Sequence, residues 1–238
     1  MLKKVSKFLS FLLVAGIAVF DINSVFSDDI VYVRDIFKNN VCFLSGERML
    51  SIEGIIMHST ACPGIEARDW EIRWNKIDGI TTCVHGFVDG MCYHHTLPSF
   101  YKGAHCREPG NSNYIGIEIC EPKSIVYNAE KTEIIKEKSD FDSPAAIEDF
   151  IHRWENAAMS AAAYCQIYGF DPMRDVISHC EAGKRGIGSR HSDPEHWWKY
   201  WGRDMDDFRN YVCYLLDNES ERVARLSRQI VATDSLYR

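Results

Sequence analysis

The pattern of apolar and polar residues along the chain predicts strands and helices that alternate. Short apolar runs that end in polar residues indicate strands, whereas apolar residues three or four positions apart indicate one face of a helix. The predicted strands cover residues 30–33, 54–60, 82–88, 91–96, 114–120 and 175–178. The predicted helices cover residues 65–74, 144–168 and 205–216. Because strands alternate with helices, we expect a single α/β domain with a central mixed β-sheet flanked by helices.

Local signals support some of these boundaries. Ser143 directly precedes Pro144, and this pair is typical of a helix N-cap followed by the first helical position. Gly169 is expected to end the same helix. Asp89-Gly90 lies between two predicted strands and predicts a hairpin with a type I′ turn.

The N-terminal residues have the pattern of a secretory signal peptide. Three lysines stand among the first seven residues, and residues 8–20 form an apolar run. This run is shorter than the roughly 20 residues that a membrane-spanning helix needs. Val25 and Ser27 offer a small-residue cleavage pattern. We therefore predict a signal peptide over residues 1–27, with an uncleaved membrane anchor as the alternative.

The composition is that of an ordinary globular protein, and the length alone allows one domain or two. The chain has 238 residues, of which 46% are hydrophobic, and this is enough for a sizeable core. With no repeat or linker in the sequence, we expect one domain over residues 28–217 and a charged C-terminal tail over residues 218–238. The net charge of −7 argues against a nucleic-acid partner. The nine cysteines favour some disulfides in an exported protein, although their spacing does not determine the pairing.

Two histidines and one aspartate are the first candidates for chemistry. His58 and His179 each end an apolar strand, and Asp193 lies in the loop that follows the second strand. Ligands of α/β folds bind at the carboxyl ends of strands. Two imidazoles and one carboxylate would form a zinc site with an open fourth position, in a groove at the strand ends. The alternative is that each histidine only makes structural hydrogen bonds.

Glu118 is an isolated carboxylate among the aliphatic residues of a predicted strand. A charged group is costly to bury unless it is paired or functional. One interpretation is a general base that takes a proton from water activated by the metal. The alternative is an edge strand on which Glu118 faces water.

Five motifs follow one another in order between residues 41 and 202. They read GIIMHST, HGFVDG, KGAHC, NYIGIEIC and SHCEAGKRGIGSRHSDPEHWW. The series resembles the zinc-dependent N-acetylmuramoyl-L-alanine amidases of the amidase type 2 family, whose superfamily includes phage T7 lysozyme and the peptidoglycan recognition proteins. The similarity is strongest to the bacterial and phage members that carry a long SHxEGxxxGIxSxHxDxxHWW loop.

The resemblance implies one zinc ion per chain and roles for five residues. His58, His179 and Asp193 match the three zinc ligands of the family. Glu118 matches the acidic residue that activates water and protonates the leaving amine. His191 stands where relatives carry a residue that stabilises the oxyanion, although a loop histidine that only bonds backbone remains an alternative. The implied reaction is hydrolysis of the amide bond between N-acetylmuramic acid and L-alanine in peptidoglycan.

Three further residues are candidates for substrate binding. His105 in the KGAHC motif matches a histidine that lines the substrate groove in the family, although Ala104 stands where an aromatic residue is common. Asn113 could bind the peptide stem or cap a strand. Trp197 could stack on sugar or peptide, but at least two of the three tryptophans in this segment are expected in the core.

The expected partner is peptidoglycan or its muropeptide fragments, outside the cytoplasm, with no nucleic acid and no membrane span in the mature protein. The alternative function is a non-catalytic peptidoglycan recognition protein of the same fold. Such binders typically lack one zinc ligand, whereas all three positions are filled here. A zinc peptidase of another class is a third hypothesis, against which the absence of an HExxH motif argues.

Overall fold

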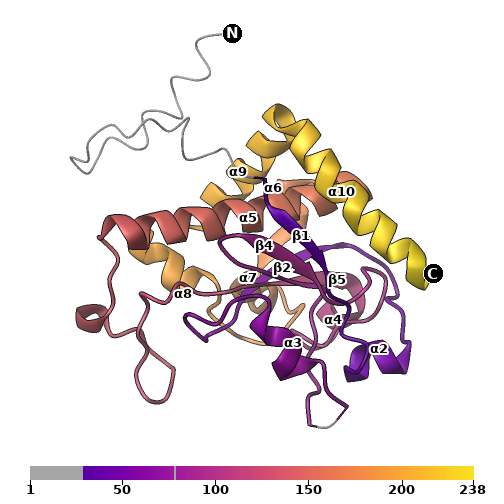
Figure 1. The fold of residues 1–238 in the computed structure, drawn as a ribbon, viewed down its shortest axis with the longest axis horizontal. Coiled ribbons are helices and arrows are strands. Elements are labelled where there is room, and N and C mark those ends of the chain that lie inside the picture. Colours follow the sequence, from indigo (N-terminus) through magenta and orange to yellow (C-terminus); the bar gives the residue numbers. More distant parts are fainter. Residues whose placement is uncertain (1–28, 78) are drawn as a thin grey trace.

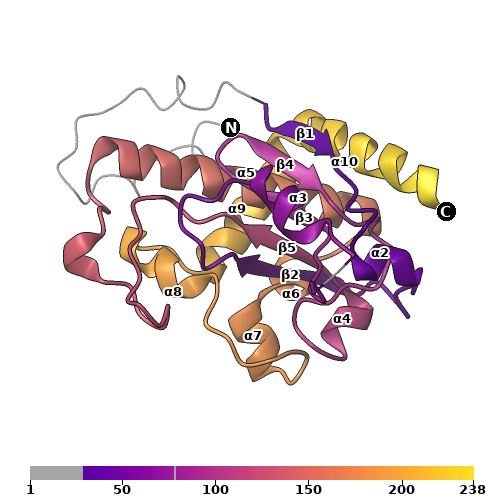
Figure 2. The same ribbon diagram turned by 60° about the horizontal axis from the view of Figure 1, so that its bottom comes forward.

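Six strands form one mixed sheet at the centre of the molecule (Figures 1 and 2), in a computed structural model that describes residues 29–77 and 79–238. The strands lie in the order β1-β4-β3-β5-β2-β6. They are β1 (Val31–Arg34), β2 (Gly54–Ser59), β3 (Gly86–Val88), β4 (Cys92–His95), β5 (Tyr114–Ile119) and β6 (Val176–Ser178). β3 and β4 pair in the antiparallel sense, and the other four pairs are parallel. The predicted mixed sheet is confirmed.

Helices flank the sheet. The longest are α5 (Pro144–Tyr168), α9 (Met205–Asn218) and α10 (Ser220–Asp234), and Figure 1 shows them on one side of it. The shorter helices are α2 (Val41–Ser45), α3 (Asp69–Trp74), α4 (Gly110–Asn113), α6 (Pro172–Asp175), α7 (His179–Lys184) and α8 (Glu195–Trp198). Single 3-10 turns cover Lys136–Lys138, Lys199–Trp201 and Ser235–Tyr237. Within the described part of the chain, no helix combines the length and apolar composition that crossing a bilayer requires. The predicted signal peptide lies outside the described residues.

The two faces of the central strands have different surroundings. Ile55 and Met57 of β2 belong to the main hydrophobic core, together with residues of α5, α9 and α10. Ile56 instead joins a cluster with residues of β6 and α7. Alternate residues of a strand point to opposite faces. His58 therefore lies on the face of Ile56, away from α5, and so does Glu118, its partner on β5.

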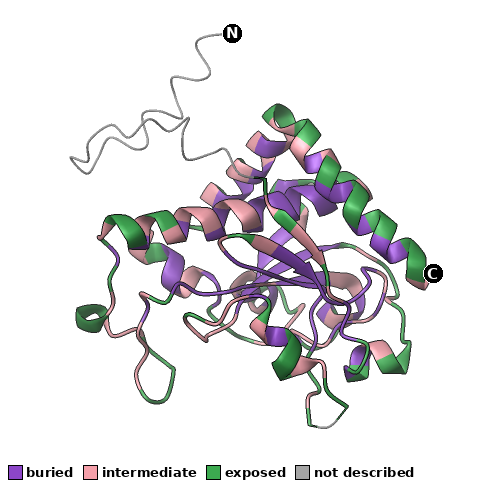
Figure 3. Cartoon of the chain, viewed as in Figure 1, coloured by how far each residue is buried: buried purple, intermediate pink, exposed green. Residues whose placement is uncertain are grey.

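α5 begins and ends where the sequence predicts. The Ser143 side chain accepts a hydrogen bond from Ala146 N, Pro144 is the first helical residue, and Gly169 follows the helix with a φ of 72°. Several side chains that face the sheet are alanine, which lets the helix lie close to the strands, and Figure 3 shows the buried inner side and the exposed outer side. The buried residues of this inner side include Phe150, Trp154, Ala157, Ala158, Ala161, Ala162 and Cys165.

Residues 218–238, which the sequence predicts to be a charged tail, begin at the last residue of α9 and continue through α10 and the turn after it. Val223, Leu226 and Ile230 are at most 2% exposed and belong to the main core. The arginines and glutamate of α10 lie on its outer side or at its margin. The segment is therefore rich in charge and still contributes to the same core as the sheet.

The turn between β3 and β4 is not the type I′ turn that the sequence predicts. Neither Asp89 nor Gly90 has the positive φ that this turn requires at both central positions. Instead, Asp89 Oδ1 accepts hydrogen bonds from the backbone N–H groups of Met91, at 2.8 Å, and Cys92, at 2.7 Å. Because the aspartate side chain satisfies these donors, the connection lengthens to a loop of three residues between Val88 and Cys92.

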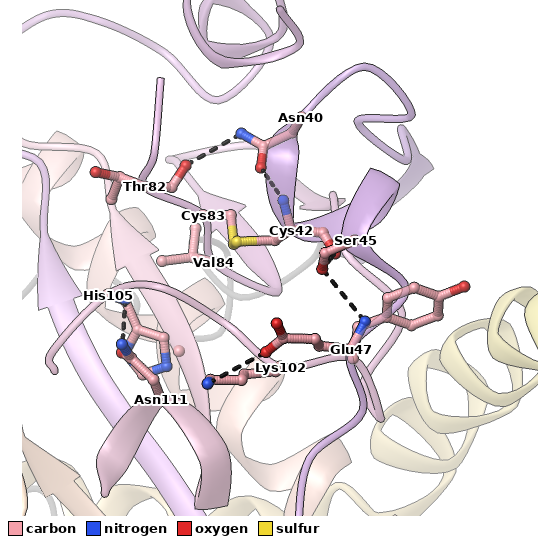
Figure 4. The surroundings of a disulfide bond; sticks show 12 residues. Asn40, Cys42, Ser45, Glu47, Thr82, Cys83, Val84, Lys102, His105 and Asn111 are labelled. Atoms are coloured by element: carbon pink, nitrogen blue, oxygen red, sulfur yellow. Dashed lines mark hydrogen bonds and ion pairs between the residues drawn. A yellow bond between two sulfur atoms is a disulfide. The ribbon is translucent and has the colours of Figure 1, made fainter. Parts of the chain in front are cut away.

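A disulfide bond joins α2 to the segment before β3 (Figure 4). It links Cys42 and Cys83, which are 41 positions apart in the sequence. Asn40 supports the same junction, because its side chain accepts from Cys42 N and donates to Thr82 O. The other seven cysteines are free thiols. The covalent loop contains β2 and α3, so it encloses one of the strands that carry the candidate site.

Candidate metal centre

Three side chains from separate segments converge at one end of the sheet. His58 lies near the end of β2, His179 is the first residue of α7 directly after β6, and Asp193 lies in the loop before α8. β2 and β6 are parallel neighbours, so their carboxyl ends meet at the same edge. One possible ligand atom from each residue lies within 4.8 Å of the others, and all three residues are buried.

The atoms that face one another are two imidazole nitrogens and a carboxylate. His58 Nδ1 lies 3.0 Å from His179 Nδ1 and 3.4 Å from Asp193 Oδ2, and His179 Nδ1 lies 3.3 Å from Asp193 Oδ1. Burial disfavours the charged form of Asp193, but its contacts with the His179 and His58 imidazoles outweigh this effect and hold the pKa of the carboxyl well below its ordinary value. The ionised carboxylate and two imidazoles are a donor set that fits zinc.

Hydrogen positions on His58 follow from the backbone carbonyl of Tyr114. A carbonyl can only accept, so His105 Nε2, which lies 3.2 Å from Tyr114 O, carries a hydrogen. Burial lowers the pKa of His105 well below its ordinary value, so the ring is neutral and its Nδ1 has a lone pair. This lone pair accepts from His58 Nε2–H at 2.9 Å. Burial also lowers the pKa of His58, so its Nδ1 keeps a lone pair that points at His179 and Asp193.

His105 is held in this position by two glycines and an asparagine. A Cβ atom on Gly116 would lie 2.8 Å from the His105 ring, and one on Gly103 would lie 2.6 Å from it. Asn111 Oδ1 accepts from His105 N at 2.9 Å, as Figure 4 shows. Because both ring nitrogens of His105 are engaged within the protein, the ring orients His58, and neither nitrogen is free for the substrate contact that we expected.

The other two candidate ligands are supported by serines. Ser189 Oγ lies 2.9 Å from His179 Nε2, so the Nδ1 of this ring also faces the centre. The backbone N–H of Ser59 donates to Asp193 Oδ2 at 3.3 Å. Sequence reasoning missed both serines. Serine is common in loops and at strand ends, and only the folded arrangement places these two beside ligand candidates.

Glu118 lies beside His58 in the register of the parallel pair β2 and β5. β5 is flanked by β3 and β2, so the alternative of an edge strand is excluded. Glu118 Oε2 is buried without a hydrogen-bond partner. Burial, followed by the charges of Asp193 and Glu121, raises the pKa of this carboxyl well above its ordinary value. A carboxyl group with an unused oxygen and a raised pKa next to a donor cluster is suited to proton transfer.

His191 lies on the solvent side of the same cluster. Its ring stacks on the His179 ring, with centroids 4.3 Å apart and an interplanar angle of 7°. Its Nδ1 is 3.7 Å from Asp193 Oδ1, and its side chain is 58% exposed. His191 can therefore approach a ligand from outside, whereas His58 is enclosed.

Trp197 does not have the position that substrate stacking needs. Its side chain is fully buried, and its ring meets Phe150 and Trp201 edge-on. A ring without exposed surface has no face to offer a sugar or peptide, so Trp197 is a core residue in this structure.

Asn113 also lies away from the cluster. It ends α4 directly before β5, whereas Glu118 lies near the opposite end of that strand. Five residues of extended chain span roughly 16 Å. The Asn113 side chain donates to Ser51 and Glu53, so it ties the start of β5 to the segment before β2.

Comparison with known proteins places this centre in a family. Residues 48–196, more than half of the chain, match the family model described as N-acetylmuramoyl-L-alanine amidase. The chain belongs to the N-acetylmuramoyl-L-alanine amidase family. The range matched to the amidase family contains His58, Glu118, His179, His191 and Asp193, so the whole centre lies within it.

Individual relatives of this amidase family are distant in sequence. A Bacillus licheniformis protein described as a probable N-acetylmuramoyl-L-alanine amidase is 22% identical over 217 residues, which are 85% of this chain and 53% of that protein. The chain thus spans about half the length of this curated relative. The structure of the Staphylococcus aureus hydrolase AmiA in complex with its ligand has a TM-score of 0.55 at 21% identity, over 82% of this chain and 87% of that one. The structure of the catalytic domain of XlyA has a TM-score of 0.53 at 19% identity, over 77% of this chain and 99% of that one. These likenesses show a shared fold.

Proposed function

We propose that the chain is a zinc-dependent hydrolase that cleaves the amide bond between N-acetylmuramic acid and L-alanine in peptidoglycan. The observation that carries the proposal is the convergence of His58, His179 and Asp193, with Glu118 beside them on the adjacent strand. Membership of the amidase family supports the substrate class. The reaction is consistent with an exported protein, which residues 1–27 predict.

The three proposed ligands would hold one zinc ion per chain. Zinc supplies a Lewis acid that polarises a carbonyl oxygen and makes water more acidic. His105 and Ser189 orient the two imidazoles, and Ser59 N–H orients the Asp193 carboxylate. These contacts leave the donor atoms facing a common point before any metal binds.

Glu118 is the proposed general base and acid. It accepts a proton from the attacking water and delivers it to the nitrogen of the leaving L-alanine. The raised pKa of its carboxyl favours the protonated form that the second step needs, and a zinc ion at the neighbouring centre would favour the ionised form that the first step needs. His191, on the open side, is the proposed hydrogen-bond donor to the oxygen of the carbonyl under attack.

The test is product analysis combined with one isosteric substitution. The zinc-loaded protein should release fragments with new L-alanine amino termini from purified sacculi, and no new reducing sugar ends. Glu118→Gln should lower turnover by about 10²–10⁴-fold, because the amide cannot accept the proton. Its zinc content should equal that of the wild type. Glu148→Gln, at an exposed position of α5, is the matched control and should keep full activity.

Two outcomes would contradict the proposal in different ways. A wild-type protein that binds muropeptides without cleaving them would favour a recognition function. Normal activity of Glu118→Gln would show that another group transfers the proton.

A further inference from the structure

Glu121 is a second carboxyl group at the site end of β5, and the proposed reaction does not use it. It lies two residues beyond the end of the strand and is fully buried. Its Oε1 accepts a hydrogen bond from Ser59 Oγ at 2.8 Å and lies 3.6 Å from His196 Nε2. A buried carboxyl group is costly, so its partners should reveal what it holds in place.

On the β2 side, Glu121 fixes the residue that orients Asp193. The Ser59 hydroxyl donates to Glu121, while the Ser59 backbone N–H donates to Asp193 Oδ2 at 3.3 Å. Ser59 is also the neighbour of His58. The side chain of Glu121 therefore sets the conformation of a residue that contacts one proposed ligand and adjoins another.

On the α8 side, Glu121 lies against the helix that follows Asp193. His196 lies on α8, three residues after Asp193, and its backbone N–H donates to Ser192 O at 3.0 Å. The Tyr127 hydroxyl lies 2.6 Å from His196 Nε2 and also bonds to Glu121. Glu121, Tyr127 and His196 thus form a partly buried cluster that connects the Asp193 loop to the end of β5.

We propose that Glu121 is a positioning residue, which holds the Asp193 carboxylate in the orientation that metal binding needs. It acts through Ser59 on one side and through His196 on the other. This inference rests on the proposed metal site, and Glu121 itself does not touch the substrate because it has no exposed surface. Outer contacts of this kind commonly change metal affinity by about 10- to 100-fold.

The test compares the zinc affinity of a Glu121 variant with that of a variant at Glu155, a partly buried glutamate. Glu155 on α5 bonds to Tyr211 of α9, and burial raises the pKa of both glutamates to about 7. Zinc affinity is measured by competition with a chromophoric chelator, and ligand geometry by the visible absorption of the cobalt-substituted protein. Glu121→Ala should weaken zinc binding about 10- to 100-fold and alter the cobalt spectrum. Glu155→Ala should leave the zinc affinity within about twofold of the wild-type value and the cobalt spectrum unchanged. Its site of substitution lies on the other side of the sheet from the metal centre.

Further variants separate positioning from general destabilisation. Glu121→Gln keeps an oxygen that can accept from Ser59, so it should lose less affinity than Glu121→Ala. Ser59→Ala should also weaken zinc binding. The double variant Ser59→Ala/Glu121→Ala should lose less than the product of the two single losses, because both act along one path.

Wild-type zinc affinity and an unchanged cobalt spectrum in Glu121→Ala would overturn the proposal, as would an equal loss in Glu155→Ala. If Glu121→Ala does not fold, Ser59→Ala decides: about tenfold weaker binding supports the proposal, and unchanged binding overturns it. Another result would contradict the proposed function and not the positioning role of Glu121. A zinc-bound wild type without amidase activity would remove that function and leave the affinity comparison valid, whereas a wild type that binds no zinc would remove both.

Discussion

At the scale of single residues, the proposed ligands are oriented by atoms that need not contact a metal. The Tyr114 carbonyl, acting through His105, leaves the lone pair of His58 on Nδ1. Glycine at positions 103 and 116 leaves the room that the His105 ring occupies. His191 differs from these supporting residues, because it is more than half exposed and stacks on His179 from outside.

The exposure of His191 allows its proposed catalytic role to be tested separately from a structural one. His191→Ala should lower kcat by about 10²–10³-fold, because it removes the proposed donor to the developing oxyanion. Zinc content and Tm should stay near the wild-type values, since an exposed side chain contributes little to folding. Steady-state kinetics with metal analysis of the same sample checks this. An unchanged kcat would make His191 an ordinary loop residue, and a loss of zinc would make it part of the metal site.

At the scale of elements, α5 and α10 show what periodicity can and cannot predict. α5 could be predicted with both of its ends, because its cap, its first-turn proline and its terminal glycine are local signals. The packing of α10 could not be predicted, because charged residues dominate its composition. Its three buried apolar residues indicate a core contact only once the surface that they pack against is known. The prediction of a type I′ turn at Asp89-Gly90 was also wrong. The Asp89 side chain accepts hydrogen bonds from two backbone N–H groups, and the backbone does not adopt the geometry that is usual for Asp-Gly.

Adjacent residues of α10 provide a matched test of its contribution to the core. Ile230 is fully buried, whereas Val231 is 42% exposed. Ile230→Ala should reduce the free energy of unfolding by about 2–5 kcal/mol, because it leaves a cavity in the main core. Val231→Ala should change it by about 0.5 kcal/mol or less. Urea unfolding measures the free energy of unfolding of both variants. Equal effects of the two substitutions would mean that α10 does not contribute to the core.

At the scale of the whole molecule, sheet register decides which predicted site residues meet. His58, His179 and Glu118 could be predicted because each lies near the carboxyl end of a strand, and the parallel pairs bring those ends together. Asn113 does not join them, because it lies at the other end of β5. Trp197 failed because the sequence does not say whether a tryptophan beside a loop faces solvent or core. Glu121 gave no signal, since its partners Ser59 and His196 are distant from it in the sequence.

Buried histidines should make the folding stability of the metal-free protein depend on pH. Burial lowers the pKa of His95 from 6.5 to about 4. As pH falls from about 6.5 to about 4, the unfolded chain takes up a proton that folded His95 does not, so stability is lost across this range, by up to about 3 kcal/mol. The advantage of the wild type over His95→Gln in urea unfolding should therefore shrink as pH falls.

Glu155 provides the opposite case for the same measurement. Burial raises its pKa from 4.5 to about 7, so the folded state keeps a proton that the unfolded chain loses, and stability declines as pH rises from about 4.5 to about 7. The advantage of the wild type over Glu155→Gln should shrink in that direction. Equal, flat differences for the two variants would contradict both shifts.

The disulfide between Cys42 and Cys83 has a consequence for damage by proteases. Lys76 and Ile77 are exposed and lie inside the covalent loop. A trypsin-like cut after Lys76 therefore leaves two fragments that stay joined through the sulfur bridge. The strand that carries His58 cannot diffuse away from the nicked chain, and the two pieces separate only when a reductant is added.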